Sequence, residues 1–263
     1  MSDYQFLQLE YRAGCATVWL NRPERHNAFH QGLLSELPRC LTLLSQDSAV
    51  RAIVLAGRGH NFCAGADLEW MQQQARAGYD ANLEDARRLA WMLRTLAQVP
   101  KPTIARVHGV ALGGGMGLVA ACDIAMATRE AGFATTEVRL GLTPSTIAPY
   151  VIAAIGERAA RRYFLSGERF DAQEALRIGL IHEALDADAL DARVGQLFEA
   201  LRSAGPQAQA HCKRLLASLR GHDALDPQVA EQTARSIAEV RAGEEAREGI
   251  AAFFEKRKPS WTA

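Results

Sequence analysis

The sequence has no excess of charge of either sign. Its 263 residues include 30 Lys and Arg and 30 Asp and Glu, so the formal net charge is zero at pH 7. Binding to a nucleic-acid backbone relies on concentrated positive charge, and a balanced chain has no broad field of that kind. Nucleic acid is therefore not expected to be a main partner.

Cysteines and long apolar runs are also scarce. The five cysteines are odd in number and form no C-x-x-C pair, which excludes a disulfide framework and a zinc knuckle. The most apolar stretch, residues 109–122, is too short for a hydrocarbon core of ~30 Å and is interrupted by glycines. The chain opens with charged residues and no apolar signal segment. We therefore expect a cytoplasmic protein with no membrane partner.

Metal-binding patterns are missing as well. None of the seven histidines belongs to an H-E-x-x-H motif. His26 and His30 are four residues apart, but no third ligand is apparent. No metal site is expected, since zinc sites need three or four such ligands.

The residues that are present have the composition of a globular protein, with 48% hydrophobic and 23% charged. Apolar patterning and turn residues predict a layered α/β core followed by a helical region without strands beyond about residue 200. Pro38 falls inside one expected helix and should cost a hydrogen bond or produce a kink. The expected strands are 6–12, 15–21, 52–57, 102–109, 124–128 and 132–138. The expected helices are 27–46, 67–76, 80–98, 114–121, 149–155, 157–165, 171–178, 186–203, 206–219, 225–241 and 243–257.

A glycine cluster at residues 113–117 is the strongest local signal. It reads GGGMG at a strand-to-helix junction, where backbone N–H groups can face a ligand without obstruction. The spacing fits neither the dinucleotide fingerprint G-x-G-x-x-G nor a P-loop. Tight packing of a helix on a sheet is the alternative explanation.

A second loop of small residues, Cys63 to Asp67, also precedes an expected helix. Two such loops can place two backbone N–H donors around one oxygen atom, which is the arrangement of an oxyanion hole. Asp67 itself is well placed to cap the following helix, and this structural role is as plausible as a catalytic one.

Glu137 is the candidate acid–base residue. It is expected at the end of a strand in an apolar run, where burial would raise its pKa toward neutrality and suit it to proton transfer. The alternative is a surface ion pair with Arg139 or Arg129.

Six segments form a set that runs in order along nearly the whole chain. They are LNRPERHNAF (20–29), FCAGADL (62–68), KPTIARVHGVALGGGMGL (101–118), CDIAMAT (122–128), FATTEVRLGLTP (133–144) and FFEKRKP (253–259). By these segments the sequence resembles the enoyl-CoA hydratase/isomerase (crotonase) superfamily. The resemblance implies a crotonase-like spiral core of ββα turns over residues 1–200. It also implies a helical C-terminal oligomerisation region over residues 201–263, and a homotrimer or a hexamer.

The resemblance also implies an acyl-CoA thioester substrate, with coenzyme A as part of the substrate and no separate cofactor. The backbone N–H groups of Ala66 and Gly114 would hold the thioester oxygen, and Glu137 would be the catalytic carboxyl. Hydratases of the superfamily usually have a further glutamate, whose position falls on Gly117. This departure leaves two possibilities for what replaces it, an ordered water or a distal carboxylate of the substrate.

Two activities remain open. Residues 65–73 and 136–172 resemble bacterial 3-methylglutaconyl-CoA and isohexenylglutaconyl-CoA hydratases, which also tend to have a small residue at the position of Gly117. We therefore expect a hydratase, a lyase that adds water across C2=C3 of a branched glutaconyl thioester of leucine or terpene catabolism. Arg139 is a candidate counter-charge for the distal acid by its nearness to Glu137. The alternative is a Δ3,Δ2-enoyl-CoA isomerase with a single glutamate.

The usual lysine that contacts CoA falls on Glu24, so Arg25 or Arg22 would have to serve. Phe253 and Lys256 match residues that reach CoA, often from a neighbouring subunit. The positions expected to contact substrate or CoA are Arg25, Ala64, Asp67, Leu68, Phe253 and Lys256.

Two other classes are weighed against an enzyme. Some members of the superfamily bind RNA, and binding that weakens steeply with salt would indicate this class. An inactive scaffold is the other class, and Gly117 is the reason to consider it.

Overall fold

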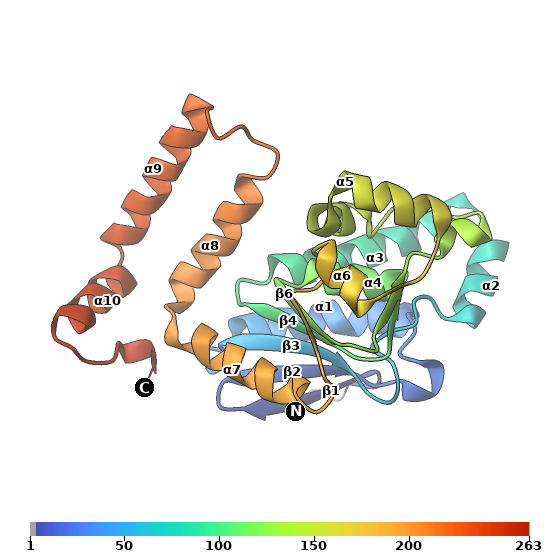
Figure 1. Cartoon of the computed structure of the whole chain (residues 1–263), viewed down its shortest axis with the longest axis horizontal. Helices are drawn as coiled ribbons and strands as arrows, with labels where there is room; N and C mark the ends of the chain where they lie inside the picture. The colour runs from blue at the N-terminus through green and yellow to red at the C-terminus, as the bar shows by residue number, and fades with distance from the viewer. Residues whose placement is uncertain (1–3, 263) are drawn as a thin grey trace.

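A six-stranded sheet forms the centre of the body in this computed structural model, which describes residues 4–262 (Figure 1). The strand order is β1-β2-β3-β4-β6-β9. β1 and β2 form an antiparallel hairpin around Ala13 and Gly14, and the other neighbours are parallel. The strands are β1 Leu7–Arg12, β2 Cys15–Leu20, β3 Ala52–Gly57, β4 Thr103–Val107, β6 Ile124–Thr128 and β9 Glu183–Leu185.

A second sheet of three short strands lies next to the first. It contains β5 Val110–Leu112, β7 Gly132–Ala134 and β8 Phe170–Asp171, in the order β5-β7-β8. β4 continues into β5 and then α4, and β6 continues into β7. Each of these turns of the chain gives one strand to each sheet, and the predicted α/β class with ββα turns is confirmed.

Helices cover both faces of the main sheet. α1 (Gln31–Gln46), α3 (Tyr79–Gln98), α4 (Gly114–Ala121) and α5 (Ala148–Ser166) surround the larger apolar core. α7 (Leu190–Ser203) covers the other face. β3 is buried at every position because Ile53 and Leu55 enter the larger core while Val54 enters the smaller one. This explains why β3 reads as a continuous apolar run, as buried parallel strands do.

α1 begins at Gln31, four residues later than predicted. His26 and Asn27 have positive φ angles of 51° and 56°, and Phe29 forms an isolated bridge with Ala66. Tertiary contacts therefore keep the segment before α1 irregular. Pro38 is buried inside α1, and the helix continues through it.

The start of α1 is capped by His30. Its Nδ1 accepts a hydrogen bond from the backbone N–H of Gly32 at 3.1 Å, so the imidazole must be neutral. Burial, with a smaller contribution from Arg22, lowers the pKa of His30, although Asp67 and Glu36 act in the opposite direction. Because the unfolded chain takes up this proton at higher pH than the folded protein, the stability gained from the cap is present above the unfolded pKa and lost as the pH falls through it.

We expect His30→Asn to keep the cap and to reduce the loss of stability between about pH 7 and pH 5, because an amide oxygen accepts without titrating. His30→Ala should lower the free energy of unfolding by about 1 kcal/mol at neutral pH. Urea unfolding of both variants across this pH range tests the prediction. An unchanged pH dependence in His30→Asn would contradict it.

Several local predictions needed correction. β7 ends at Ala134, and Glu137 begins a short 3-10 helix, η2 (Glu137–Leu140), rather than ending a strand. β5, β8 and β9 were not predicted as separate strands, because two or three residues carry no periodic pattern of their own. The break predicted between two helices at residue 156 is confirmed, since Gly156 has φ 73° and ψ 161° inside α5.

The helices after α7 form an arm that extends away from the body (Figure 1). It consists of α8 (Pro206–Ser218), α9 (Pro227–Ala242), α10 (Glu244–Phe254) and the 3-10 helix η3 (Ser260–Thr262). No residue of α8 or α9 is fully buried. No strand is found beyond residue 200 in the described part of the chain, as predicted. The division of the chain into two domains stays a prediction.

The arm is fastened to the body through Lys213 of α8, which forms an ion pair of 2.6 Å with Asp123, and through Arg51. The guanidinium of Arg51, just before β3, donates to the carbonyl oxygens of Ala204 and Trp261, each at 2.7 Å. The indole N–H of Trp261 donates in turn to Ser203 O at 3.1 Å. The beginning and the end of the arm therefore meet next to the main sheet.

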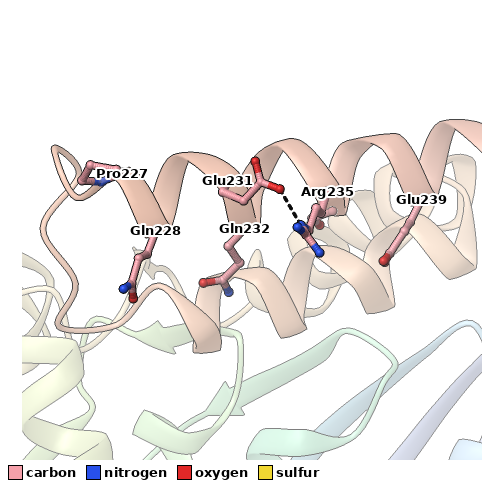
Figure 2. Close-up of a pocket in the computed structure, with 7 residues that line it drawn as sticks. Pro227, Gln228, Glu231, Gln232, Arg235 and Glu239 are labelled. Carbon is pink, nitrogen blue, oxygen red and sulfur yellow. Dashed lines mark hydrogen bonds and ion pairs between the residues drawn. The ribbon is translucent and has the colours of Figure 1, made fainter.

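A polar hollow runs along α9 (Figure 2). Glu231 and Arg235 form an ion pair of 2.6 Å in its wall, and Gln228 and Gln232 lie beside them. None of the residues expected to take part in chemistry lines this hollow. No helix in residues 4–262 combines the length and apolarity needed to cross a bilayer.

Candidate active site

The loop of small residues before α2 (Leu68–Arg76) runs alongside β5. Cys63 donates its backbone N–H to Val110 O and accepts from Leu112 N–H, both at 3.0 Å. Cys63 and Ala111 form a parallel bridge. Three residues further along each segment the chain reaches Ala66 and Gly114, and Phe29 lies next to both, through its bridge with Ala66 and its ring against Gly114.

The opposite side of the loop is held by the segment before α1. Phe29 donates to Gly65 O at 2.6 Å and accepts from Asp67 N–H at 2.9 Å. The backbone N–H of Ala64 donates to His26 O at 3.0 Å. The loop is thus fixed on both sides by main-chain bonds that do not use the N–H of Ala66.

Both of the backbone donors expected at this site lack a protein acceptor. Within residues 4–262, neither the N–H of Ala66 nor the N–H of Gly114 donates to another protein group. Gly114 is the first residue of α4, where the helix leaves N–H groups unpaired and adds partial positive charge. The positions predicted for an oxyanion hole therefore have free donors.

Glu137 lies directly against this helix start. A Cβ added to Gly113 would be 2.9 Å from Glu137 Oε1, so only a glycine lets the carboxyl approach so closely. Glu137 Oε2 is buried and has no hydrogen-bond partner among the described residues. Burial raises the pKa of Glu137, and a hydrogen bond from its own backbone lowers it by less.

The alternative surface pairs of Glu137 are not formed. Arg129 is bound to Asp186 at 2.8 Å. Arg139 lies beside Gly167, where an added Cβ would be 3.2 Å from Arg139 Nε. The carboxyl of Glu137 is therefore available for proton transfer, with Arg139 on the same short helix.

Asp67 has the capping role that was weighed for it. Its Oδ1 accepts from the N–H groups of Glu69 and Trp70, at 2.8 and 3.3 Å, at the start of α2. Its Oδ2 forms an ion pair of 2.8 Å with Arg22. Burial would raise the pKa of Asp67, but the hydrogen bonds from Trp70, Glu69 and Arg22 outweigh it and lower the pKa.

We expect Asp67→Ala to lower the free energy of unfolding by about 2–3 kcal/mol. The helix cap is lost, and Arg22, whose side chain is 20% exposed, keeps only the more distant carboxylate of Glu24 at 3.9 Å. Asp226→Ala is the matched control, because Asp226 caps α9 through Gln228 N–H and has no ion pair in the structure; it should cost about 1 kcal/mol. Equal losses in urea unfolding would contradict the contribution of Arg22. Because the pKa of Asp67 is lowered, its contribution should be present above pH ~4 and be lost at lower pH.

The two arginines expected to contact CoA on this side both form ion pairs within the chain. Arg22 is bound to Asp67, whereas Arg25, which is 49% exposed, pairs with Glu69 at 2.8 Å. Leu68 is 74% exposed at the start of α2. Of the two arginines, Arg25 is the one whose pair lies at the surface.

Phe253 and Lys256 are not brought to this site within one chain. Phe253 lies in the last turn of α10 in the arm and Lys256 follows the helix, and both are exposed. α10 lies at the far end of the molecule from α2 and α4 (Figure 1). A contact with the same substrate would therefore need a second chain.

Three features of the site had no signal in the sequence. Phe29 packs against Gly114, where an added Cβ would be 2.4 Å from its ring. Ile147 packs against Gly117, 2.3 Å from such a Cβ. The buried carboxyl of Asp85 in α3 accepts from the side chains of Trp70 and Gln74 and holds α2 in place. All three contacts join residues far apart in the chain, and no local pattern marks them.

The comparisons with known proteins agree with this geometry. Residues 10–263 match the family described as enoyl-CoA hydratase/isomerase. The chain belongs to this family. Its activity is that of an enoyl-CoA hydratase or isomerase, and its substrate is an acyl-CoA thioester.

Solved members of the hydratase/isomerase family have the same fold. An enoyl-CoA hydratase from Shewanella pealeana is 43% identical, with a TM-score of 0.95 over 98% of this chain and 96% of that one. AtuE from Pseudomonas aeruginosa is 38% identical, with a TM-score of 0.92 over 98% of this chain and all of that one. Among relatives matched by sequence, a mevalonyl-coenzyme A hydratase from Aspergillus fumigatus is 33% identical over 92% of this chain and 89% of its own length. The predicted crotonase-like fold is confirmed.

Proposed function

We propose that the protein is a hydratase that adds water across C2=C3 of a branched glutaconyl thioester, 3-methylglutaconyl-CoA or isohexenylglutaconyl-CoA. The observation that carries the proposal is the position of Glu137. Its carboxyl lies against Gly113, next to the free N–H of Gly114, and Oε2 has no protein partner. A relative named for mevalonyl-coenzyme A, whose acyl group is branched at C3, supports a branched substrate.

The proposed reaction uses one carboxyl in two steps. The thioester oxygen accepts hydrogen bonds from Ala66 and Gly114, which stabilise the negative charge it gains. Glu137, as a carboxylate, takes a proton from water while the water oxygen bonds to C3. The enolate that forms then receives this proton from Glu137 at C2. A raised pKa suits both steps, because the group must accept a proton and give it back.

Δ3,Δ2-Enoyl-CoA isomerisation is the second candidate, and the filled space at Gly117 favours it. Glu137 would then take a proton from C2 and return it at C4, with the dienolate oxygen held by the same two N–H groups. This reaction needs a single carboxyl and no water.

The two activities are separated by following the enoyl-thioester absorbance in water enriched in ¹⁸O. Hydration removes the absorbance and labels the product with one oxygen atom. Isomerisation of a Δ3 substrate increases the absorbance without label. The two glutaconyl thioesters are compared with crotonyl-CoA, and a preference for crotonyl-CoA would contradict the proposed substrate. If none of the thioesters reacts, the protein is an inactive scaffold.

Oligomerisation is part of the proposal. Phe253 and Phe254 are each 77% exposed on an arm that extends from the body, which suits docking on a second chain. We propose a homotrimer or hexamer in which Phe253 and Lys256 reach the CoA of a neighbouring subunit. A mass of three or six chains in solution is expected, together with weaker CoA binding by Lys256→Ala. A cytoplasmic location and the lack of a separate cofactor remain part of this proposal.

A further inference from the structure

Gly117 and Ile147 form a tight apolar contact between α4 and the start of α5. A Cβ added to Gly117 would be 2.3 Å from Ile147 Cγ2 and 2.9 Å from Ile147 Cβ. Ile147 is 1% exposed and immediately precedes α5. The branch at Cβ makes this side chain stiff, so the volume beside Gly117 is filled permanently.

This contact lies one turn along α4 from the glycine that meets Glu137. The backbone N–H of Gly117 donates to Gly113 O at 3.1 Å, so the two glycines are neighbours at the start of the helix. Gly113 contacts the carboxyl of Glu137, and Gly117 contacts Ile147. Leu93 of α3, fully buried, adds to the same apolar surface, 3.7 Å from the added Cβ. Ile147 is thus the neighbour of Glu137 one helical turn along α4.

No charged side chain replaces the missing hydrogen-bond partner of Glu137. Arg139, on the same short helix, lies beside Gly167, and Arg22 is bound to Asp67. The groups that meet at Gly113 and Gly117 from α3 and α4 are Leu93 and the glycines themselves, and none of them is charged. The environment of the carboxyl on this side is therefore apolar.

We propose that Ile147 is a positioning residue that confines proton transfer to Glu137, because it fills the space from which a second acid–base group or a chain of waters would reach the substrate. The inference rests on the proposed acyl-CoA chemistry and specifies how the site works with one carboxyl. It also explains why residue 117 is a glycine, since any side chain there would collide with Ile147.

Ile147→Ala opens this space to water, and the better solvation stabilises the carboxylate of Glu137. We expect the pKa of Glu137 to fall by about one unit, and the rise of kcat/KM with pH to begin about one unit lower. The carboxyl band in infrared titration, assigned by its loss in Glu137→Gln, measures this pKa without turnover. Ile147→Val removes one methyl group and should give a smaller shift in the same direction, which keeps the test valid if the alanine variant does not fold.

Ile155→Ala is the matched control. Ile155 is a buried isoleucine on α5 that lines a hollow with Arg158 and Tyr163, outside the site. It should lose stability as Ile147→Ala does and leave the titration of Glu137 unchanged. Gly117→Ala should lower the free energy of unfolding, because its methyl group collides with Ile147. The double variant Gly117→Ala with Ile147→Ala should recover part of this stability.

The outcomes separate this inference from the proposed function. If the wild type converts no enoyl thioester, the proposed function fails. If the wild type is active but the Glu137 band does not move in folded Ile147→Ala or Ile147→Val, or moves equally in Ile155→Ala, Ile147 does not have this role.

Discussion

Glu137→Gln is expected to lower kcat by about 10²- to 10⁴-fold while the affinity for acyl-CoA changes only a few-fold. The amide has the shape of the carboxyl and fits against Gly113, but it cannot take a proton from water or from C2. The pH dependence of the wild type should agree with this role. Because burial raises the pKa of Glu137, kcat/KM should fall as the pH drops through a value above the ordinary 4.5.

Glu130→Gln is the control for this prediction, since Glu130 is an exposed glutamate in the turn between β6 and β7. It should leave both kcat and binding unchanged. Steady-state kinetics and calorimetric titration with a non-reacting acyl-CoA give the two quantities. Retention of wild-type turnover by Glu137→Gln would remove this residue from the mechanism.

Gly114→Pro is expected to lower kcat/KM by a further 100- to 1,000-fold relative to Gly114→Ala, as the loss of one oxyanion donor does in other enzymes. Proline is accepted at the first position of a helix, and Gly114 holds this position in α4. Both substitutions push the Cβ against the ring of Phe29, so this clash is common to the two variants. What differs is the loss of the backbone N–H and the ring carbon Cδ that takes its place in proline.

The thermal stability of the two Gly114 variants should be measured beside their kinetics. Similar melting temperatures with very different kcat/KM would assign the difference to the donor. Equal kcat/KM in the two variants would contradict the assignment of Gly114 to the oxyanion hole, because its backbone N–H would then contribute nothing to the reaction.

Most of the larger elements were predictable because their patterns are local. β3, α4 and β6 have the predicted bounds, since continuous apolar runs and glycine boundaries mark their ends. α1 was predicted to start too early, because the bridge between Phe29 and Ala66 overrides the helical pattern. β9 lies between the helices predicted at 171–178 and 186–203 and is not predicted, because its three residues become a strand only by pairing with β6.

The site was predictable to a similar degree. The two small-residue loops indicate backbone donors, and the resemblance to the family singles out Ala66 and Gly114 in them and supports Glu137. The structure leaves both N–H groups without a protein acceptor and places Glu137 against the start of α4. Their roles stay predictions. Ile147 was not found, because its contact with Gly117 crosses thirty residues of chain and depends on how α5 approaches α4. The capping role of Asp67 followed from its position, but its ion pair with Arg22 did not.

The attachment of the arm by Arg51 has a geometric consequence. Arg51 joins the beginning and the end of the arm, and Lys213 joins α8 to the body. Whole helical turns added to both α8 and α9 beyond Lys213 would change how far the arm extends and leave both attachments in place. The reach of the arm is in this sense adjustable, independently of the candidate active site.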